Sequence, residues 1–123
     1  MRKSLVRGAA FVVAALFAAC AHAQPNAAAD ASLDDAWRAV RIADCARCHG
    51  KDHEGLAAPS IVGFARTQNR ERFVAAVLDG NPPMGMPAYR GTPLVEDRIE
   101  AIYRYFAGRA DGSIGPGAAP HGR

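Results

Sequence analysis

The chain has 123 residues, enough for one small domain, and it contains 15 lysines and arginines against 12 aspartates and glutamates. Three of the basic residues, Arg2, Lys3 and Arg7, lie at the amino terminus, so residues 24–123 carry no net charge. The charge balance therefore gives no reason to expect a nucleic-acid partner, because phosphate binding requires a basic domain surface.

The first 23 residues have the pattern of a cleaved export signal. The basic start is followed by twelve apolar residues, from Gly8 to Ala19, and then by the small residues of Ala21-His22-Ala23. This pattern predicts cleavage after Ala23 and a periplasmic protein. Twelve apolar residues are too few to span a bilayer, which needs about 20. A lipoprotein signal at Cys20 is the alternative, although the preceding leucine stands one position too early for that motif.

The first helix is expected to begin at Ser32. Residues 24–31 are rich in alanine and are interpreted as a flexible mature amino terminus. The Ser32 side chain is a good N-cap, and acidic residues follow in the first turn, where the helix dipole favours them. Apolar side chains then recur at the spacing of one helix face: Leu33, Ala36, Trp37 and Val40. This spacing predicts an amphipathic helix that packs on the core.

The central motif of the sequence is CARCH, at residues 45–49. On a helical turn, Cys45 and Cys48 present both sulfur atoms to one side, and the ring of His49 can turn to the same space. This arrangement attaches haem through two thioether bonds, with His49 as an iron ligand. A thioredoxin-like dithiol would need a βαβ context, a zinc site would have to recruit His53, and a disulfide would leave His49 unexplained.

With this motif, the chain resembles the class I c-type cytochromes, which are small single-haem electron carriers. The resemblance covers residues 33–106 and implies an all-α cytochrome c fold, with three to four short helices packed around one covalently bound haem, in a domain at residues 32–108. The lack of alternating apolar and polar residues also favours an all-α fold. Trp37 and Arg41 stand where the family has a glycine and an aromatic residue, so the crossing of the first and last helices remains open.

Residues 50–66 are expected to form a loop, because glycines and a proline interrupt them. Residues 58–63 resemble a proline-containing loop of the family, in which a backbone carbonyl accepts a hydrogen bond from the iron-binding histidine. Such a bond fixes the tautomer of the ring and raises its basicity as a ligand. The resemblance assigns this role to the Pro59 carbonyl and places Ile61 against the haem. An ordinary proline turn is the alternative.

Residues 70–78 predict a second helix, with Thr67 or Asn69 as its N-cap and Gly80 as its C-cap.

The segment after this helix, residues 81–89, displays two methionines on an irregular loop, because turn-forming residues surround them. Methionine ordinarily fills cores. However, the sequence Met-Pro-Ala-Tyr that begins at Met86 resembles the axial-methionine motif of the family, whereas Met84 is not followed by proline. The resemblance therefore implies that Met86 rather than Met84 is the second iron ligand, and it places Tyr89 at the haem edge.

Thr92 and Pro93 predict the start of a third helix, which is expected to end at Gly108. Residues 109–123 are interpreted as a loose tail. Their glycine-rich sequence resembles the carboxyl termini of cytochromes that accept electrons from quinoprotein alcohol dehydrogenases. His53 is interpreted as an exposed residue of a polar loop.

The implied ligand set indicates an electron carrier rather than an enzyme, because an axial methionine closes the iron to substrates and favours the ferrous state. We expect a periplasmic monomer without stable membrane insertion. Its redox partners would be a periplasmic dehydrogenase or a respiratory complex as the electron donor, and an oxidase or another cytochrome as the acceptor. The alternatives are a dedicated cytochrome subunit or partner of a quinoprotein dehydrogenase, and a haem enzyme or sensor with an open sixth position.

Overall fold

The computed structural model describes residues 25–117, 119 and 120. These residues form α-helices, one 3-10 helix and no β-strand, which confirms the all-α prediction. The proposed signal peptide, its cleavage site and Cys20 lie outside the described residues. No described helix is both long enough and apolar enough to cross a bilayer. The elements are α1 (Pro25–Ile42), α2 (Ala46–His49), α3 (Ile61–Thr67), α4 (Arg70–Asp79), η1 (Pro82–Met84), α5 (Pro93–Glu96) and α6 (Ile99–Asp111).

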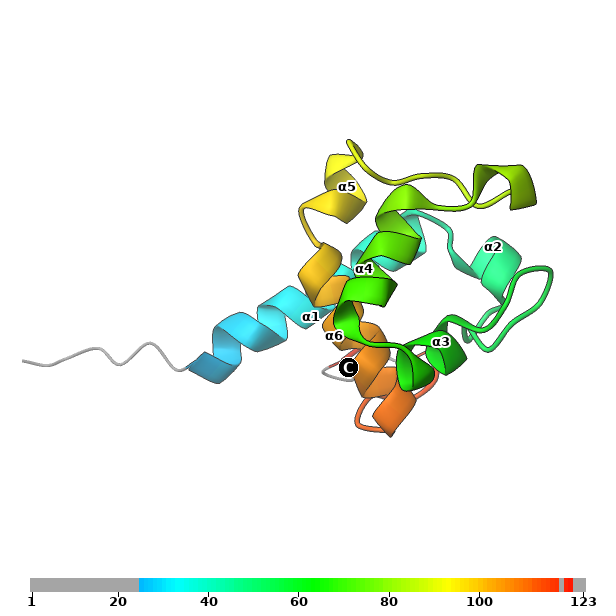
Figure 1. The fold of residues 1–123 in the computed structure, drawn as a ribbon. Helices are drawn as coiled ribbons and strands as arrows, with labels where there is room; N and C mark the ends of the chain where they lie inside the picture. Colours follow the sequence, from blue (N-terminus) through cyan, green and yellow to red (C-terminus); the bar gives the residue numbers. More distant parts are fainter. Residues whose placement is uncertain (1–24, 118, 121–123) are drawn as a thin grey trace, which may run out of the picture.

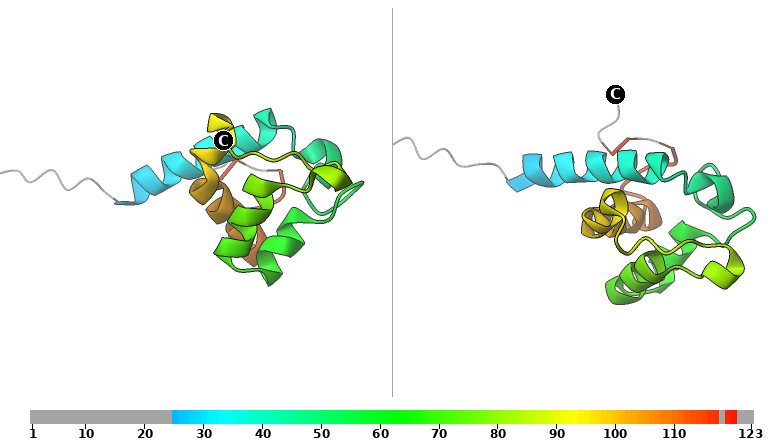
Figure 2. Two further views of the ribbon diagram at one scale, coloured as in Figure 1. Left: turned by 45° about the horizontal axis from the view of Figure 1, so that its top comes forward. Right: turned by 90° about the horizontal axis from the view of Figure 1, so that it is seen from above.

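The carboxyl-terminal helix α6 is the centre of the fold. It packs against α1 on one side and against α3 and α4 on the other, and α2 lies at the carboxyl end of α1 (Figures 1 and 2). Burial of apolar side chains between these helices supplies the main driving force for folding. The buried cluster consists of Ala36, Ala39, Val40, Val62, Phe73, Val95, Ala101, Ile102, Tyr105, Phe106 and Ile114.

Helix α1 begins seven residues earlier than expected, at Pro25 rather than after Ser32. Residues 25–31, part of the segment 24–31 that was expected to be flexible, thus belong to a helix. Alanine has the highest helix propensity, and proline is well tolerated in the first turn of a helix, so this segment continues the helix that follows it. Ser32 is not an N-cap; its hydroxyl instead accepts a hydrogen bond from Arg104 Nη2 at 2.8 Å.

The crossing of α1 and α6 uses alanines instead of the family's glycine. Ala36 and Ala39 are almost completely buried in the core, where α1 packs on α6. Their small side chains permit a close approach of the two helices. Trp37 is only partly buried, and the guanidinium of Arg41 lies 5.0 Å from the centre of its ring, in a cation–π contact. Trp37 therefore lies at the edge of the interface between α1 and α6, and the two alanines occupy its centre.

Helix α3 was not predicted, because residues 50–66 read as one loop. The structure begins a helix at Ile61. The Ser60 hydroxyl accepts a hydrogen bond from the Gly63 N–H at 2.8 Å, which is a typical N-cap interaction. The glycine inside this short helix hides its periodicity in the sequence. The true loop is therefore residues 50–60.

Helix α4 agrees closely with the predicted second helix. The N-cap is Asn69, whose Oδ1 accepts a hydrogen bond from the Arg72 N–H at 2.9 Å, whereas Thr67 belongs to α3. Gly80 is the C-cap, with a positive φ of 64°.

The predicted third helix is broken into α5 and α6, and it continues past Gly108 to Asp111. Arg98, between the two parts, has a non-helical φ of −113°. The chain then turns back, and the Ile114 N–H donates to the Gly108 carbonyl at 2.9 Å. Ile114 is buried against Gly108, where even a methyl group would lie 2.8 Å from its Cδ1 atom. Arg109 and Ile114 are therefore buried, so the segment that was expected to form a loose tail is anchored to the core at these two residues.

Candidate haem site

Cys45 precedes α2 as its N-cap residue, Cys48 lies within α2, and both thiols are free. Burial raises the pKa of the Cys45 thiol to about 11. A reactive dithiol of the thioredoxin type needs the opposite shift, because the thiolate is the attacking species. The environment of Cys45 therefore argues against the dithiol alternative, and both free thiols remain available for covalent attachment.

A zinc site is also disfavoured by the structure. Within the described part of the chain, no three His, Cys, Asp or Glu side chains are placed so that they could hold a metal ion. His53, which such a site would have to recruit, is buried against Phe106 instead.

His49 has one ring nitrogen fixed by the backbone. Its Nδ1 atom lies 2.6 Å from the carbonyl oxygen of Pro59, the contact expected from the sequence. A carbonyl oxygen can only accept a hydrogen bond, so Nδ1 carries a proton and donates it, and Nε2 is the ring nitrogen left for a metal. The contact thus holds the ring in the orientation in which iron would be bound through Nε2.

The loop after α2 is tied to that helix before it reaches Pro59. The Gly55 N–H donates to the His49 carbonyl at 2.8 Å, and the Ala58 N–H donates to the Cys48 carbonyl at 2.9 Å. Gly50 allows the tight return, because its φ is +88° and a Cβ atom there would lie 2.8 Å from the Gly55 carbonyl oxygen. These contacts use the free carbonyls at the end of α2 and position the Pro59 carbonyl opposite His49.

Met86 is held by its backbone on both sides. Its N–H and carbonyl pair with those of Asn81, at 3.1 and 2.9 Å. The next residue, Pro87, packs against Gly80 so closely that a Cβ atom at Gly80 would lie 2.6 Å from the Pro87 carbonyl carbon. Met84 instead occupies the end of η1, where it is 82% exposed. The structure thus distinguishes an anchored Met86 from a projecting Met84.

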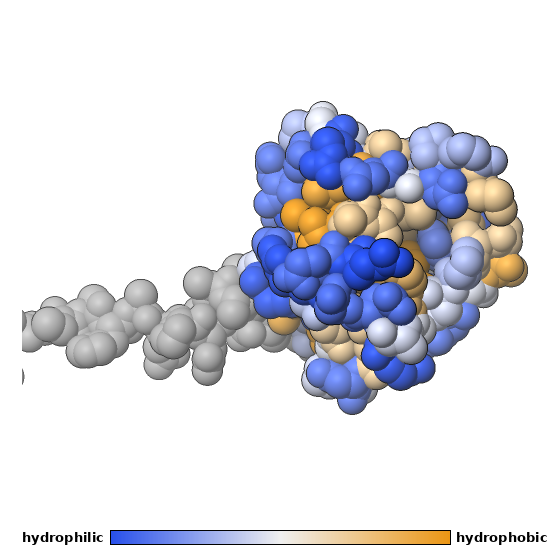
Figure 3. All heavy atoms as spheres, in the orientation of Figure 1, coloured by the Kyte–Doolittle hydropathy of each residue, from blue (hydrophilic) through white to orange (hydrophobic). Residues whose placement is uncertain are grey.

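Tyr89 and Ile61 lie at the border of the core. Both are partly buried against the central cluster, and the Tyr89 N–H donates to the Leu78 carbonyl at 3.0 Å. Burial raises the pKa of Tyr89, and the cysteine sulfurs of the motif contribute to this shift, so the phenol is close to them. Figure 3 shows apolar residues around a hollow in this face of the molecule. An imidazole with a free Nε2, two free thiols and an apolar border are what a covalently bound haem requires, so the residues present fit this cofactor.

Residues 28–106 match the family model described as cytochrome c oxidase, cbb3-type, subunit III. The chain belongs to this family of c-type cytochromes. Cytochrome c-555 of Methylococcus capsulatus is 28% identical over 117 residues, which is 94% of this chain and 93% of the relative. The cytochrome c-553-like protein of Synechocystis is 32% identical over 59 residues, 48% of this chain and 55% of the relative. No solved structure shows a significant match. These relationships identify a small monohaem cytochrome with an electron-transfer haem c.

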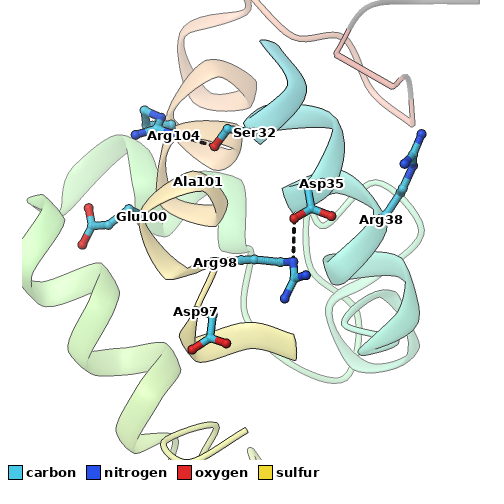
Figure 4. A pocket seen from close by; sticks show the side chains of 8 residues that line it. All are labelled: Ser32, Asp35, Arg38, Asp97, Arg98, Glu100, Ala101 and Arg104. Atoms are coloured by element: carbon cyan, nitrogen blue, oxygen red, sulfur yellow. Dashed lines mark hydrogen bonds and ion pairs between the residues drawn. The ribbon is translucent and has the colours of Figure 1, made fainter. Parts of the chain in front are cut away.

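A polar cleft of the cytochrome lies away from the predicted haem residues. It has a volume of about 490 Å³ and includes none of the predicted haem residues. Across this cleft Arg98 Nε forms an ion pair with Asp35 Oδ2 at 2.7 Å, and Arg104 Nη2 donates a hydrogen bond to the Ser32 hydroxyl at 2.8 Å (Figure 4). Its lining consists of Ser32, Asp35, Arg38, Asp97, Arg98, Glu100, Ala101 and Arg104.

His53 is buried in the cytochrome, so its interpretation as a surface residue is wrong. It is 6% exposed, and its ring contacts Phe106 edge-on, with the ring centres 5.2 Å apart. Neither ring nitrogen has a hydrogen-bond partner among the described residues. Its carbonyl accepts hydrogen bonds from the N–H groups of Ile61 and Val62, which connects the loop to α3. The polar loop sequence contains no signal for this burial, because it depends on a helix about 50 residues later.

We expect the cytochrome to lose stability as the pH falls from about 6.5 to 4. Burial, and secondly the positive charge of Arg109, lower the pKa of His53 from 6.5 to about 4. Within this window the unfolded chain binds a proton that the native state does not, so the free energy of unfolding falls with pH. The full shift corresponds to about 3 kcal/mol. Urea denaturation at pH 7 and pH 4 measures the loss.

Carboxylates also titrate over this range, so the control is the same pair of measurements on His53→Gln. This variant is less stable at both pH values, but we expect its loss between them to be smaller by about 3 kcal/mol. Equal losses in the two proteins would show that His53 is not the group responsible.

Proposed function

We propose that this cytochrome carries single electrons in the periplasm through one haem, attached by thioether bonds from Cys45 and Cys48 and ligated by His49 and Met86. When bound, the haem supplies a one-electron iron couple. The observation that carries the proposal is the 2.6 Å contact between His49 Nδ1 and the Pro59 carbonyl. This contact presents Nε2 as a ligand in a fixed orientation and increases its basicity.

The anchored loop at Met86 supports electron transfer over catalysis. Backbone pairing with Asn81 and packing of Pro87 on Gly80 restrict the loop before any ligand binds. A thioether held in this way can close the sixth position of the iron with little further ordering. Iron with all six coordination positions filled can still transfer electrons to a partner, but it has no free position for a substrate. We therefore propose that the protein is not an enzyme.

Covalent attachment is tested by removing the thiols. We expect haem to stay with the wild-type chain after denaturation and acid extraction, and to be released from the Cys45→Ser/Cys48→Ser double variant, because the protein would then hold it only by ligation. Haem staining of a denaturing gel measures this directly. Free extraction of haem from the wild type would contradict the proposal.

The compartment and partners follow from the export signal and the family. We propose export with cleavage after Ala23. The amino-terminal sequence of the exported protein tests this, since a lipid-modified Cys20 at the terminus would indicate a carrier tethered to the membrane.

The description of the matched family names an oxidase subunit, which supports an oxidase as the electron acceptor. A periplasmic dehydrogenase or a respiratory complex is the proposed donor. The carboxyl-terminal segment, which resembles that of the partners of quinoprotein dehydrogenases, packs Ile114 into the core of this protein.

A further inference from the structure

Arg109 carries a buried charge near the end of α6. Its side chain is 2% exposed. Nη2 donates a hydrogen bond to the Asp52 carbonyl at 2.9 Å, and Nη1 has no hydrogen-bond partner among the described residues. The carboxylate of Glu54 approaches only to 4.0 Å and is 59% exposed. Solvent screens such an exposed group, so Glu54 compensates the charge only in part.

The guanidinium of Arg109 contacts the loop that follows the haem-binding motif. Asp52, its hydrogen-bond partner, lies in the segment that Gly55 and Ala58 tie to the carbonyls of α2. His53, the next residue, is influenced by the charge of Arg109. The charge of Arg109 is therefore connected to His49, the proposed iron ligand, through the loop that follows α2. Because the guanidinium is buried, water screens its charge weakly.

We propose that Arg109 raises the reduction potential of the haem through this buried, weakly compensated charge. The inference rests on the proposed function, because it requires haem ligated by His49. Oxidised iron carries one more positive charge than reduced iron, so a fixed positive charge in the interior disfavours oxidation. At an effective dielectric constant of about 20, a unit charge about 12 Å from a redox centre changes the electron-transfer equilibrium about tenfold. Tenfold corresponds to 59 mV for one electron.

The test compares a neutral and a charged replacement. Arg109→Gln keeps an amide donor for the Asp52 carbonyl but removes the charge, and Arg109→Lys keeps the charge. We expect the equilibrium constant for reduction by a fixed mediator to fall about tenfold in Arg109→Gln and to stay within about twofold of the wild type in Arg109→Lys. Arg104→Gln is the matched control, because Arg104 lies on the same helix but is exposed. The pKa of His53, measured by NMR, should rise in Arg109→Gln only.

Two results would overturn the inference. One is an unchanged potential in Arg109→Gln. The other is an equal fall in Arg109→Gln and Arg109→Lys, which would indicate that the hydrogen bond and not the charge is responsible.

A second pair of variants covers the case in which Arg109→Gln does not fold. Glu54→Gln removes the partial counter-charge and should raise the equilibrium constant, by less than the tenfold change expected in Arg109→Gln because Glu54 is exposed to solvent. Glu71→Gln, which changes an exposed carboxylate paired with Arg70, should leave it unchanged. Equal potentials in these two variants would also overturn the inference. A wild-type protein without covalent haem would overturn the proposed function itself. If haem is bound but its reduction potential does not respond to these substitutions, only the role of Arg109 is overturned.

Discussion

Met86→Ala should abolish the sulfur-to-iron charge-transfer band of the oxidised cytochrome and lower its reduction potential by about 100 mV or more, a fraction of the roughly 0.8 V that axial ligands control. It should also open the iron to cyanide and azide, which we expect the wild type to bind slowly. The physical reason is the loss of a soft thioether that favours ferrous iron and blocks the sixth position. Absorption spectra and a redox titration measure all three effects.

Met84→Ala is the matched control for this experiment. Both methionines lie on the same loop, but Met84 is 82% exposed on η1, whereas the backbone of Met86 is paired with Asn81. We expect Met84→Ala to leave the band, the potential and the ligand-binding rate unchanged. The opposite pattern would make Met84 the ligand and leave electron transfer in place. A wild type that lacks the band and binds cyanide rapidly would indicate a catalytic or sensing haem protein.

Gly80→Ala should destabilise the protein by about 2 to 5 kcal/mol and weaken the ligation by Met86 at the same time. Gly80 has φ 64° and ψ −161°, a region that essentially only glycine adopts. A methyl group there would lie 2.6 Å from the Pro87 carbonyl carbon and 2.7 Å from the Ala88 nitrogen. These are backbone atoms, so the loop has to move. Denaturant unfolding and the intensity of the charge-transfer band measure the two effects.

Gly85→Ala separates the close contact from backbone strain. Gly85 also has a positive φ, of 91°, but nothing lies within 4 Å of the position of its Cβ atom. We expect this variant to lose only about 1 to 2 kcal/mol, the cost of a left-handed backbone for a residue with a side chain. If Gly80→Ala cost no more than Gly85→Ala, the packing of Gly80 against Pro87 would not be what anchors the loop.

The parts of the site that depend on neighbouring residues could be predicted from the sequence. The contact between His49 Nδ1 and the Pro59 carbonyl is one of them, whereas the haem-binding roles of Cys45, Cys48 and Met86 stay predictions. Helix α4 was also predictable, because Asn69 and Gly80 are strong local signals at its two ends. In each case the information lies within about ten residues of the feature.

The parts that depend on distant contacts could not be predicted. His53 and Arg109 are polar residues, and only the packing of α6 against the loop after α2 buries them. The sequence predicts a loose tail at Ile114, because the burial of this residue depends on the space left by the missing side chain of Gly108 on α6. The break at Arg98, where the sequence predicted one continuous helix, likewise reflects tertiary packing that overrides local propensity.

The early start of α1 makes this helix a rigid arm. The seven residues from Pro25 to Ala31 add about 10 Å of helix, at 1.5 Å per residue, at the end of α1 opposite to α2 (Figure 2). A tag, an electrode linker or a fused domain joined just before Pro25 would therefore be held away from the thiols and His49. Immobilisation through this end should leave the redox end of the molecule facing the solution, whereas attachment through the loop at residues 81–89 would cover it.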